Sequence, residues 1–299
     1  MSSSRTAILV LLLSSAGWGL TWLPAKALLA LGLSSQQSIL LAFGGGALAL
    51  LPVLWRQRRH WLQQPLLLVA IGIAGGSSYA AFQTAIARGD TVRVMILFYL
   101  LPVWSALGGR YLLGERLDMR RGIAVALCIG GAALALDVNI ATLNQPVDGI
   151  DLLAIAAGFT LALTNLLFRR SNALPLASRV AAMYWGCALL IGASLLFSSA
   201  ASTAPPLPDA RAVCAALLYG IAWIGLLTFS TQWAVTKLEV AHSALLLVIE
   251  LIVAVLSTAL LVEHGLAPHE WIGALLVLGA VLLESWNPPP TEVTTKTFQ

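Results

Sequence analysis

The stretch ILFYLLPVWSALGGRYLLGER (residues 96–116) has a second, degenerate copy in LLLVIELIVAVLSTALLVEH (residues 245–264). The two align without a gap at an offset of 148 positions, and Glu115 and Glu263 then close the same L-[LV]-[GV]-E ending. Each copy is apolar and long enough to cross a bilayer, which takes about 20 residues. The pair predicts an internal repeat of membrane-spanning segments.

The rest of the chain also has the composition of a protein that lies in lipid. Of its 299 residues, 59% are hydrophobic and 10% are charged, whereas a soluble globular domain has roughly 25% charged residues. The connections between apolar segments are short, which leaves no room for a soluble domain. We therefore predict an all-α membrane protein with ten transmembrane helices, at residues 6–31, 35–55, 65–88, 91–113, 119–137, 149–168, 175–198, 210–236, 239–262 and 269–286.

The repeating unit spans five helices, and an odd number of crossings threads the second copy through the membrane in the opposite direction. We therefore expect two inverted five-helix repeats, at residues 5–140 and 148–286, followed by a disordered cytoplasmic tail at 287–299. The charges agree with this inversion. The loop RYLLGERLDMRR (110–121) holds four arginines, whereas its counterpart EHGLAPHE (263–270) has neither arginine nor lysine.

Basic residues also predict the orientation. With the N-terminus in the cytoplasm, thirteen of the seventeen Lys and Arg residues fall on inner segments, three on outer segments, and Lys26 lies in the first span. Cytoplasmic loops of membrane proteins are enriched in such residues, so both termini are expected to be cytoplasmic, in a multi-pass protein of the bacterial inner membrane. A cleaved signal peptide is the alternative for the first span, because AKA (25–27) resembles a cleavage site, but the apolar run is too long.

The repeated segments resemble the EamA-type members of the drug/metabolite transporter superfamily. The residues that carry the resemblance are WGLTWLPAK in the first span, LLPVWSALGGRYLLGE in the fourth and IELIVAVLSTALLVE in the ninth. The resemblance covers residues 5–286. It implies a cavity lined by helices one, three, four, six, eight and nine, open alternately to either side, with helices five and ten behind it. The second copy departs from the first by placing Glu250 where the first has Pro102, so the resemblance does not by itself imply that the two halves bend alike.

Glu250 is one of very few charged residues near the middle of the membrane. Such a residue costs about 2.5–3.5 kcal/mol on insertion scales, so it usually faces a cavity or a partner. Three roles are open for it: substrate or proton chemistry, structural pairing with a polar or basic group, or a neutral acid with no role. Glu250 is the candidate for proton coupling.

Several aromatic residues lie near span midpoints, where no lipid headgroup can meet a phenol or an indole nitrogen. Pairs four residues apart share one helix face, as in Trp18/Trp22. The alternative is ordinary packing with a buried hydrogen bond for each polar tip. A cavity that stacks aromatic rings resembles the YddG-type exporters of aromatic amino acids. The candidate substrate-binding residues are Trp18, Trp22, Tyr79, Gln83, Tyr99, Asn165, Tyr219, Trp223, Ser243 and Glu250.

Prolines and small residues predict how the helices bend and pack. Pro24 and Pro102 interrupt the first and fourth spans and are candidate hinges, because proline removes an intrahelical hydrogen bond. Small residues four apart allow close helix contact in lipid. We expect such seams at Gly122/Ala126/Gly130 in the fifth span and at Gly72/Gly76 in the third.

The remaining polar groups have simpler explanations. Glu115 and Glu263 are expected near the surface, pairing with basic groups or fixing loop geometry. The group Glu263, His264, His269 and Glu270 matches no strong metal signature, so we expect a solvated loop there and neither a metal site nor a cofactor. The three cysteines show no CxxC or Cys/His spacing and indicate neither a disulfide framework nor zinc.

These features predict an exporter of small metabolites, most simply aromatic or other apolar amino acids. A multidrug or nucleotide-sugar transporter on the same fold is the alternative. A nucleotide-sugar carrier needs several cationic groups in the cavity, and only Lys26, Arg88, Arg93 and Arg169 qualify. A membrane enzyme is disfavoured because no HExxH or GxSxG motif is present, and a scaffold would not need midplane aromatics. The expected partners are a small-molecule substrate and the lipid bilayer, with no nucleic acid, for a monomer or weak dimer.

Overall fold

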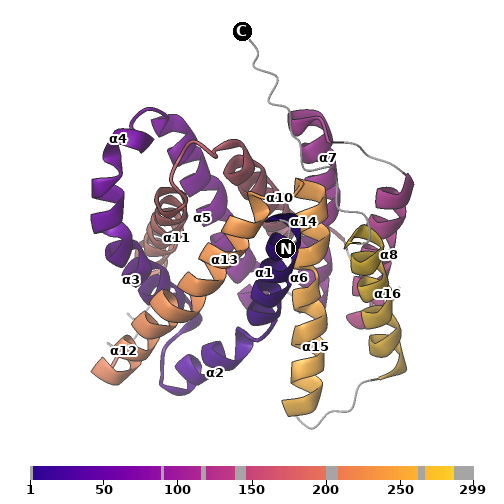
Figure 1. Cartoon of the computed structure of the whole chain (residues 1–299). Coiled ribbons are helices and arrows are strands. Elements are labelled where there is room, and N and C mark those ends of the chain that lie inside the picture. The colour runs from indigo at the N-terminus through magenta and orange to yellow at the C-terminus, as the bar shows by residue number, and fades with distance from the viewer. Residues whose placement is uncertain are drawn as a thin grey trace.

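The computed structural model describes residues 3–88, 91–115, 119–138, 146–199, 208–261 and 267–285, and every regular element in these ranges is a helix (Figure 1). The predicted tail at 287–299 and the predicted repeat boundaries at 140 and 286 lie outside the described residues. The helices are α1 Ser3–Gly19, α2 Trp22–Ala30, α3 Ser35–Arg56, α4 Arg58–Trp61, α5 Pro65–Arg88, α6 Thr91–Phe98, α7 Leu101–Leu113, α8 Met119–Ala135, α10 Gly149–Arg170, α11 Leu176–Ser199, α12 Ala210–Leu218, η1 Tyr219–Ile224, α13 Gly225–Val235, α14 Val240–Leu247, α15 Ile249–Leu261 and α16 Pro268–Ser285.

The described part of the chain contains six helical segments that are long and apolar enough to cross a membrane. Shorter apolar helices lie at His242–Ala254 and Pro268–Leu283. Large aliphatic side chains such as Leu66 and Leu196 are exposed on the outside of these helices. Helices satisfy their own backbone groups, so they can present such side chains to lipid. The six longer segments are Ser4–Ala30, Ser35–Arg56, Pro65–Ala85, Gly149–Arg170, Leu176–Leu196 and Ala210–Val235.

Two of the predicted spans are broken just ahead of a proline. The first divides into α1 and α2 at Leu20–Thr21, and Pro24 lies in the first turn of α2. The fourth divides into α6 and α7 at Tyr99–Leu100, and Pro102 lies in the first turn of α7. The first turn of a helix tolerates proline because its N–H groups have no intrahelical partner.

The predicted ninth span breaks in the same way without a proline. It divides into α14 and α15 at Val248, with Glu250 in the first turn of α15. The two halves therefore break at equivalent positions, although only the first has a proline there. In the first half Leu100 N donates to Leu97 O and Val103 N to Leu100 O; at positions 148 higher, Val248 N donates to Leu245 O and Leu251 N to Val248 O.

The eighth span contains a π-helical turn, η1, between α12 and α13. Gly220 in this turn packs directly on α3, where a Cβ atom at Gly220 would lie 2.1 Å from Ala42 O. Single π-turns inside helices are uncommon and are often found at functional sites. Here the turn lies directly against α3.

The helices pack in two outer groups around α1. α8 packs on α16 on one side of Figure 1, α3 packs on α11 on the other, and α11 also packs on α5. Between these groups, α1 contacts α13, α14 and α15, and α10 contacts α5, α6 and α7. The segments that carry the candidate residues therefore lie mainly in the middle of the molecule.

The small-residue seams are partly where the sequence predicts them. In α5, a Cβ atom at Gly72 would lie 2.9 Å from Ala182 O of α11, which fits the predicted seam. The prediction for the fifth span is wrong, because Gly122 and Gly130 have nothing within 4 Å of an added Cβ. The contact between α8 and α16 instead involves Gly131, one residue further along, whose added Cβ would lie 2.8 Å from Gly273 O.

Candidate functional site

Three tryptophans tie α1 and α2 to helices from the second half of the chain. Their indole N–H groups donate to hydroxyl oxygens: Trp18 to Thr231 at 3.1 Å, Trp22 to Ser257 at 3.0 Å, and Trp223 to Thr21 at 3.2 Å. Each polar tip thus has the hydrogen bond that the packing interpretation expects. The same bonds fix these rings in the centre of the molecule, where all three remain partly exposed.

Glu250 meets Tyr99 where the two broken helices come together. The Tyr99 hydroxyl donates to Glu250 Oε1 at 3.2 Å. Tyr99 directly follows α6, and Glu250 lies in the first turn of α15, where the positive end of the helix dipole favours a carboxylate. α1 packs on the same place, because a Cβ atom at Gly19 would lie 2.5 Å from Glu250 O. The junction therefore joins three helices around one acid.

Aromatic rings continue from α1 toward α3 and α11. The ring centroids of Trp18 and Tyr79 are 5.9 Å apart, those of Phe43 and Tyr79 are 4.6 Å apart, and those of Phe43 and Tyr184 are 4.9 Å apart. Offset or tilted pairs at such distances are favourable. Sequence reasoning missed Tyr184, although it lies near the middle of its predicted span and the same midpoint criterion selects it.

The ten predicted site residues fall into two groups by burial. Trp18, Trp22, Tyr79, Gln83, Tyr219, Trp223 and Glu250 are partly exposed, whereas Tyr99, Asn165 and Ser243 are buried. Among the buried residues, Ser243 Oγ donates to Val240 O of its own helix at 2.9 Å. Both amide atoms of Asn165 are buried without a hydrogen-bond partner in the described part of the chain. The structure brings Trp18 to Tyr79 and Tyr99 to Glu250, whereas the Ser243 hydroxyl bonds within its own helix.

One cavity of about 310 Å³ lies elsewhere, between α3, α11 and the η1–α13 segment. Its lining is apolar and includes Gly46, Tyr184 and Phe229, but none of the ten predicted residues. A pocket for a charged small metabolite needs placed polar groups, which this cavity lacks. We therefore centre the candidate site on the Tyr99–Glu250 junction.

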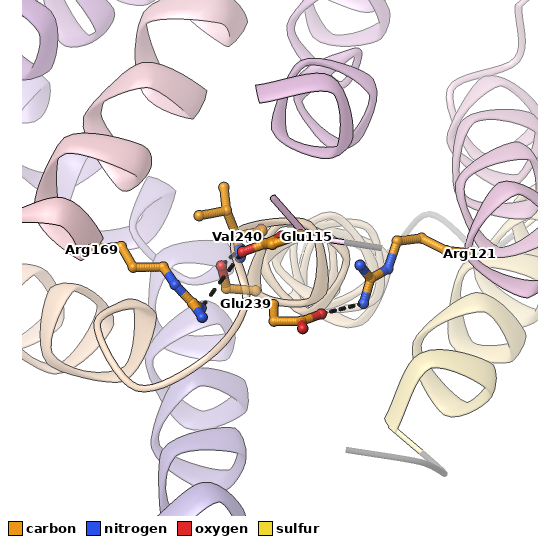
Figure 2. Close-up of polar contacts among 6 residues, drawn as sticks. Glu115, Arg121, Arg169, Glu239 and Val240 are labelled. Carbon is orange, nitrogen blue, oxygen red and sulfur yellow. Dashed lines mark hydrogen bonds and ion pairs between the residues drawn. The ribbon is translucent and has the colours of Figure 1, made fainter. Parts of the chain in front are cut away.

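A second polar centre, the Glu115 network, lies where α7, α8, α10 and α14 end or begin (Figure 2). Val240 N donates to Glu115 Oε1 at 2.8 Å, and Arg169 Nη1 lies 3.8 Å from the same oxygen. Beside them, Arg121 Nη2 donates to Glu239 Oε2 at 2.6 Å. The predicted pairing of Glu115 with a basic group is present, but its predicted surface position is wrong, because its side chain is only 5% exposed.

The other predicted groups have separate partners. His269 Nε2 lies 3.8 Å from Asp137 Oδ1, and Glu270 Oε2 accepts a hydrogen bond from Ala267 N at 2.7 Å. Glu263 and His264 lie outside the described residues. Cys128 and Cys187 are buried free thiols, and Cys214 is an exposed one.

Comparisons with known proteins identify the first half of the chain. Residues 5–136 match the model of the EamA-like transporter family. These residues are similar to an EamA-like transporter domain. A search of curated proteins found no match. One crystal structure of a protein is similar over 94% of this chain and 97% of its own, with a TM-score of 0.76 and 16% sequence identity, so the two share a fold.

The EamA-like domain indicates a multi-pass membrane transporter of the drug/metabolite type, with a small-molecule substrate and lipid around it. Transport rather than catalysis fits this family. The match ends at residue 136, whereas Glu250, Thr231 and Ser257 lie beyond it. The candidate site therefore forms where the EamA-like domain meets the rest of the chain.

Proposed function

We propose that this protein exports amino acids, with a preference for aromatic and other apolar ones, by alternating access through a central cavity. The observation that carries the proposal is the Tyr99–Glu250 junction. It places one partly exposed carboxylate and one phenol between two broken helices, with Trp18 and Tyr79 on neighbouring elements. Transporters commonly bind substrates at such discontinuous helices near the middle of the bilayer.

The proposal assigns a role to each part of the site. Glu250 binds the substrate ammonium group or a coupling proton, and Tyr99 orients its carboxylate. Trp18, Trp22, Tyr79, Tyr219 and Trp223 offer ring faces to an apolar side chain. Gln83, Asn165 and Ser243 supply polar contacts, and the helix breaks ahead of Pro24 and Pro102 act as hinges.

The architecture behind this mechanism is two inverted five-helix repeats, with ten crossings and both termini in the cytoplasm. The identical hydrogen-bond pattern at Leu97–Val103 and Leu245–Leu251 supports the repeat. So does the packing of α8 on α16, the last helices of the two copies. The protein then resides in a bacterial inner membrane as a monomer or weak dimer.

The cationic residues argue against a nucleotide-sugar substrate. Lys26 and Arg88 are exposed, and Lys26 Nζ lies 5.5 Å from the centroid of the Trp22 ring. Arg169 is engaged by Glu115. Phosphate recognition favours several converging cationic donors, which Lys26, Arg88 and Arg169 do not form. The side chain of Arg93, the fourth candidate, lies outside the described part of the chain.

The test is uptake into proteoliposomes that contain purified protein, with radiolabelled phenylalanine, tryptophan, threonine or a cationic drug. Each substrate is measured with and without an imposed pH gradient, for the natural protein and for Glu250→Gln. We expect amino-acid uptake, and its loss in Glu250→Gln if Glu250 carries the ammonium group or the proton. Uptake of the drug alone would overturn the amino-acid assignment, and uptake that ignores both the gradient and the substitution would make Glu250 structural.

A further inference from the structure

The Glu115 network joins the two halves of the chain at one end of the bundle. Glu115 follows α7, and the groups it meets are Val240 N at the start of α14 and Arg169 at the end of α10 (Figure 2). Under the proposed topology all three lie on the cytoplasmic side. One carboxylate therefore ties a helix of the first copy to two helices of the second.

Local geometry holds this carboxylate in place. Gly114 has a φ of +71°, a left-handed conformation that suits glycine, and it turns the chain so that Glu115 N donates to Gly109 O at 3.0 Å. The carboxylate then lies over Gly109, where an added Cβ would be 2.4 Å from Glu115 Oε2. The Glu115 carboxylate therefore occupies the space that a larger side chain at position 109 would need.

Glu115 also supplies a missing helix cap. Glu239 is the residue before α14 and makes no side-chain cap bond of its own, so an N–H group at the start of α14 needs another acceptor. Glu115 Oε1 accepts from Val240 N, and its charge faces the positive end of the helix dipole. The cap comes from a distant part of the chain, so moving α14 away from α7 breaks it.

The helices α1, α10 and α13, which all pack on α14, carry buried polar atoms without a hydrogen-bond partner in the described part of the chain. Among them are Ser15 Oγ on α1, both amide atoms of Asn165 on α10, and Gln232 Oε1 on α13. Each residue lies within four positions of a member of one core cluster that includes Leu11, Ala162 and Ala234. An unsatisfied buried polar group costs about 1–3 kcal/mol, so an apolar residue would serve a permanently closed core better.

We propose that Glu115 is the latch of a cytoplasmic gate, and that these polar atoms line the substrate's way in when the gate opens. The structure is then closed at this end, which agrees with the burial of Asn165 and Ser243 beside the partial exposure of Glu250 and Trp18. The inference rests on the proposed function only in requiring a transporter with two access states.

Cysteine accessibility tests the latch. Ser15→Cys, a near-isosteric change, is placed in a Cys214→Ser background, and inverted membrane vesicles are treated with a membrane-impermeant maleimide from the cytoplasmic face. Peptide mass spectrometry gives the labelling rate at each thiol. We expect Glu115→Gln to raise the rate at position 15 roughly tenfold or more, because a hydrogen bond to a charged group contributes about 1.5–3 kcal/mol.

Two further variants distinguish loss of the Glu115 contact from a general loosening of the fold. Gly109→Ala keeps both charges but displaces the carboxylate, and it should raise labelling in the same direction even if Glu115→Gln does not fold. Glu239→Gln removes the charge that pairs with Arg121 but keeps the Glu115 carboxylate and its hydrogen bond from Val240 N, so it should leave the rate within about twofold. Asn165→Cys, labelled in the same variants, reports on the opposite wall of the path.

The native thiols are internal controls. Cys128 and Cys187 are buried away from the latch and should stay unreactive in every variant. Labelling of Cys128 together with position 15 would show general loosening and overturn the gate, as would an unchanged rate at position 15 in both Glu115→Gln and Gly109→Ala. No substrate enters this assay, so loss of the amino-acid assignment leaves its outcome intact.

Discussion

The two broken helices in the middle of the molecule make the same turn with different residues. α6 and α7 part at Leu100 and α14 and α15 part at Val248, with matching hydrogen bonds on either side of each break. The first pair has Pro102 in its second position after the break, and the second pair has Glu250 there. The break therefore does not depend on proline.

The difference between the two lies in what each position offers. A first-turn position has a backbone N–H without an intrahelical partner, so it accepts a proline or a polar residue equally well. With proline the position contributes only to the turn. With glutamate it also contributes a carboxylate, which Tyr99 contacts from the other broken helix. The first copy therefore contributes a rigid proline at this position, and the second copy contributes a carboxylate.

The largest expected effect comes from giving the second copy the residue of the first. Glu250→Pro should preserve the break, because Pro102 occupies the equivalent position, while removing the carboxylate. We expect folded protein whose amino-acid uptake falls about ten- to a hundredfold, the range for losing a hydrogen-bonded charge of about 1.5–3 kcal/mol. Uptake into proteoliposomes measures the loss of transport, and size-exclusion profiles in detergent show whether the protein is folded.

Glu250→Gln is the matched control for that substitution. It keeps side-chain size and the contact with Tyr99 but removes the charge. If uptake falls equally in both variants, the charge is what matters. Normal uptake in Glu250→Gln alongside loss in Glu250→Pro would instead make the side chain's shape decisive.

The next effect concerns the aromatic groups that face this junction. Tyr79→Ala and Tyr99→Ala should each reduce uptake roughly tenfold while folded protein stays in the membrane, since losing the ring contacts of Tyr79 or the hydrogen bond of Tyr99 amounts to about 1–2 kcal/mol. Tyr99→Phe isolates the hydroxyl that reaches Glu250. Unchanged uptake in both alanine variants would remove these residues from the cavity.

A smaller effect tests how closely α1 packs on the second break. An added Cβ at Gly19 would lie 2.5 Å from Glu250 O and 2.8 Å from Val253 Cβ, so Gly19→Ala should destabilise the fold by about 1–3 kcal/mol through overpacking. Thermal unfolding in detergent measures the change. Gly130→Ala, which meets nothing within 4 Å, should leave stability unchanged or raise it, and equal losses in both would refute the packing argument.

Sequence predicted the helical membrane class and the acid at the centre because composition and periodic apolar runs depend only on local residues. It did not predict the partners of these groups. Thr231 and Ser257 accept hydrogen bonds from Trp18 and Trp22, but hydroxyl residues in a membrane span carry no signal of what they face. The burial of Glu115 was missed for the same reason, because a charge at a span end is usually solvated.

The ninth span shows a second limit. Proline is the strongest sequence signal for a helix break, and no proline lies near Val248. Both α14 and α15 pack on α1, and this long-range contact is one that no local pattern reports. The internal repeat was the better guide, because positions 148 apart share a backbone even where their side chains differ.

The smallest expected effect is that of replacing Pro102 by alanine. If packing sets the break, Pro102→Ala should leave it in place and lower stability by only about 0.4–1 kcal/mol, through the greater freedom of the unfolded chain. Uptake should stay close to that of the natural protein, as measured in the same proteoliposomes. A loss of uptake as large as that of Glu250→Gln would mean that the first break needs its proline, and the two halves would then bend alike for different reasons.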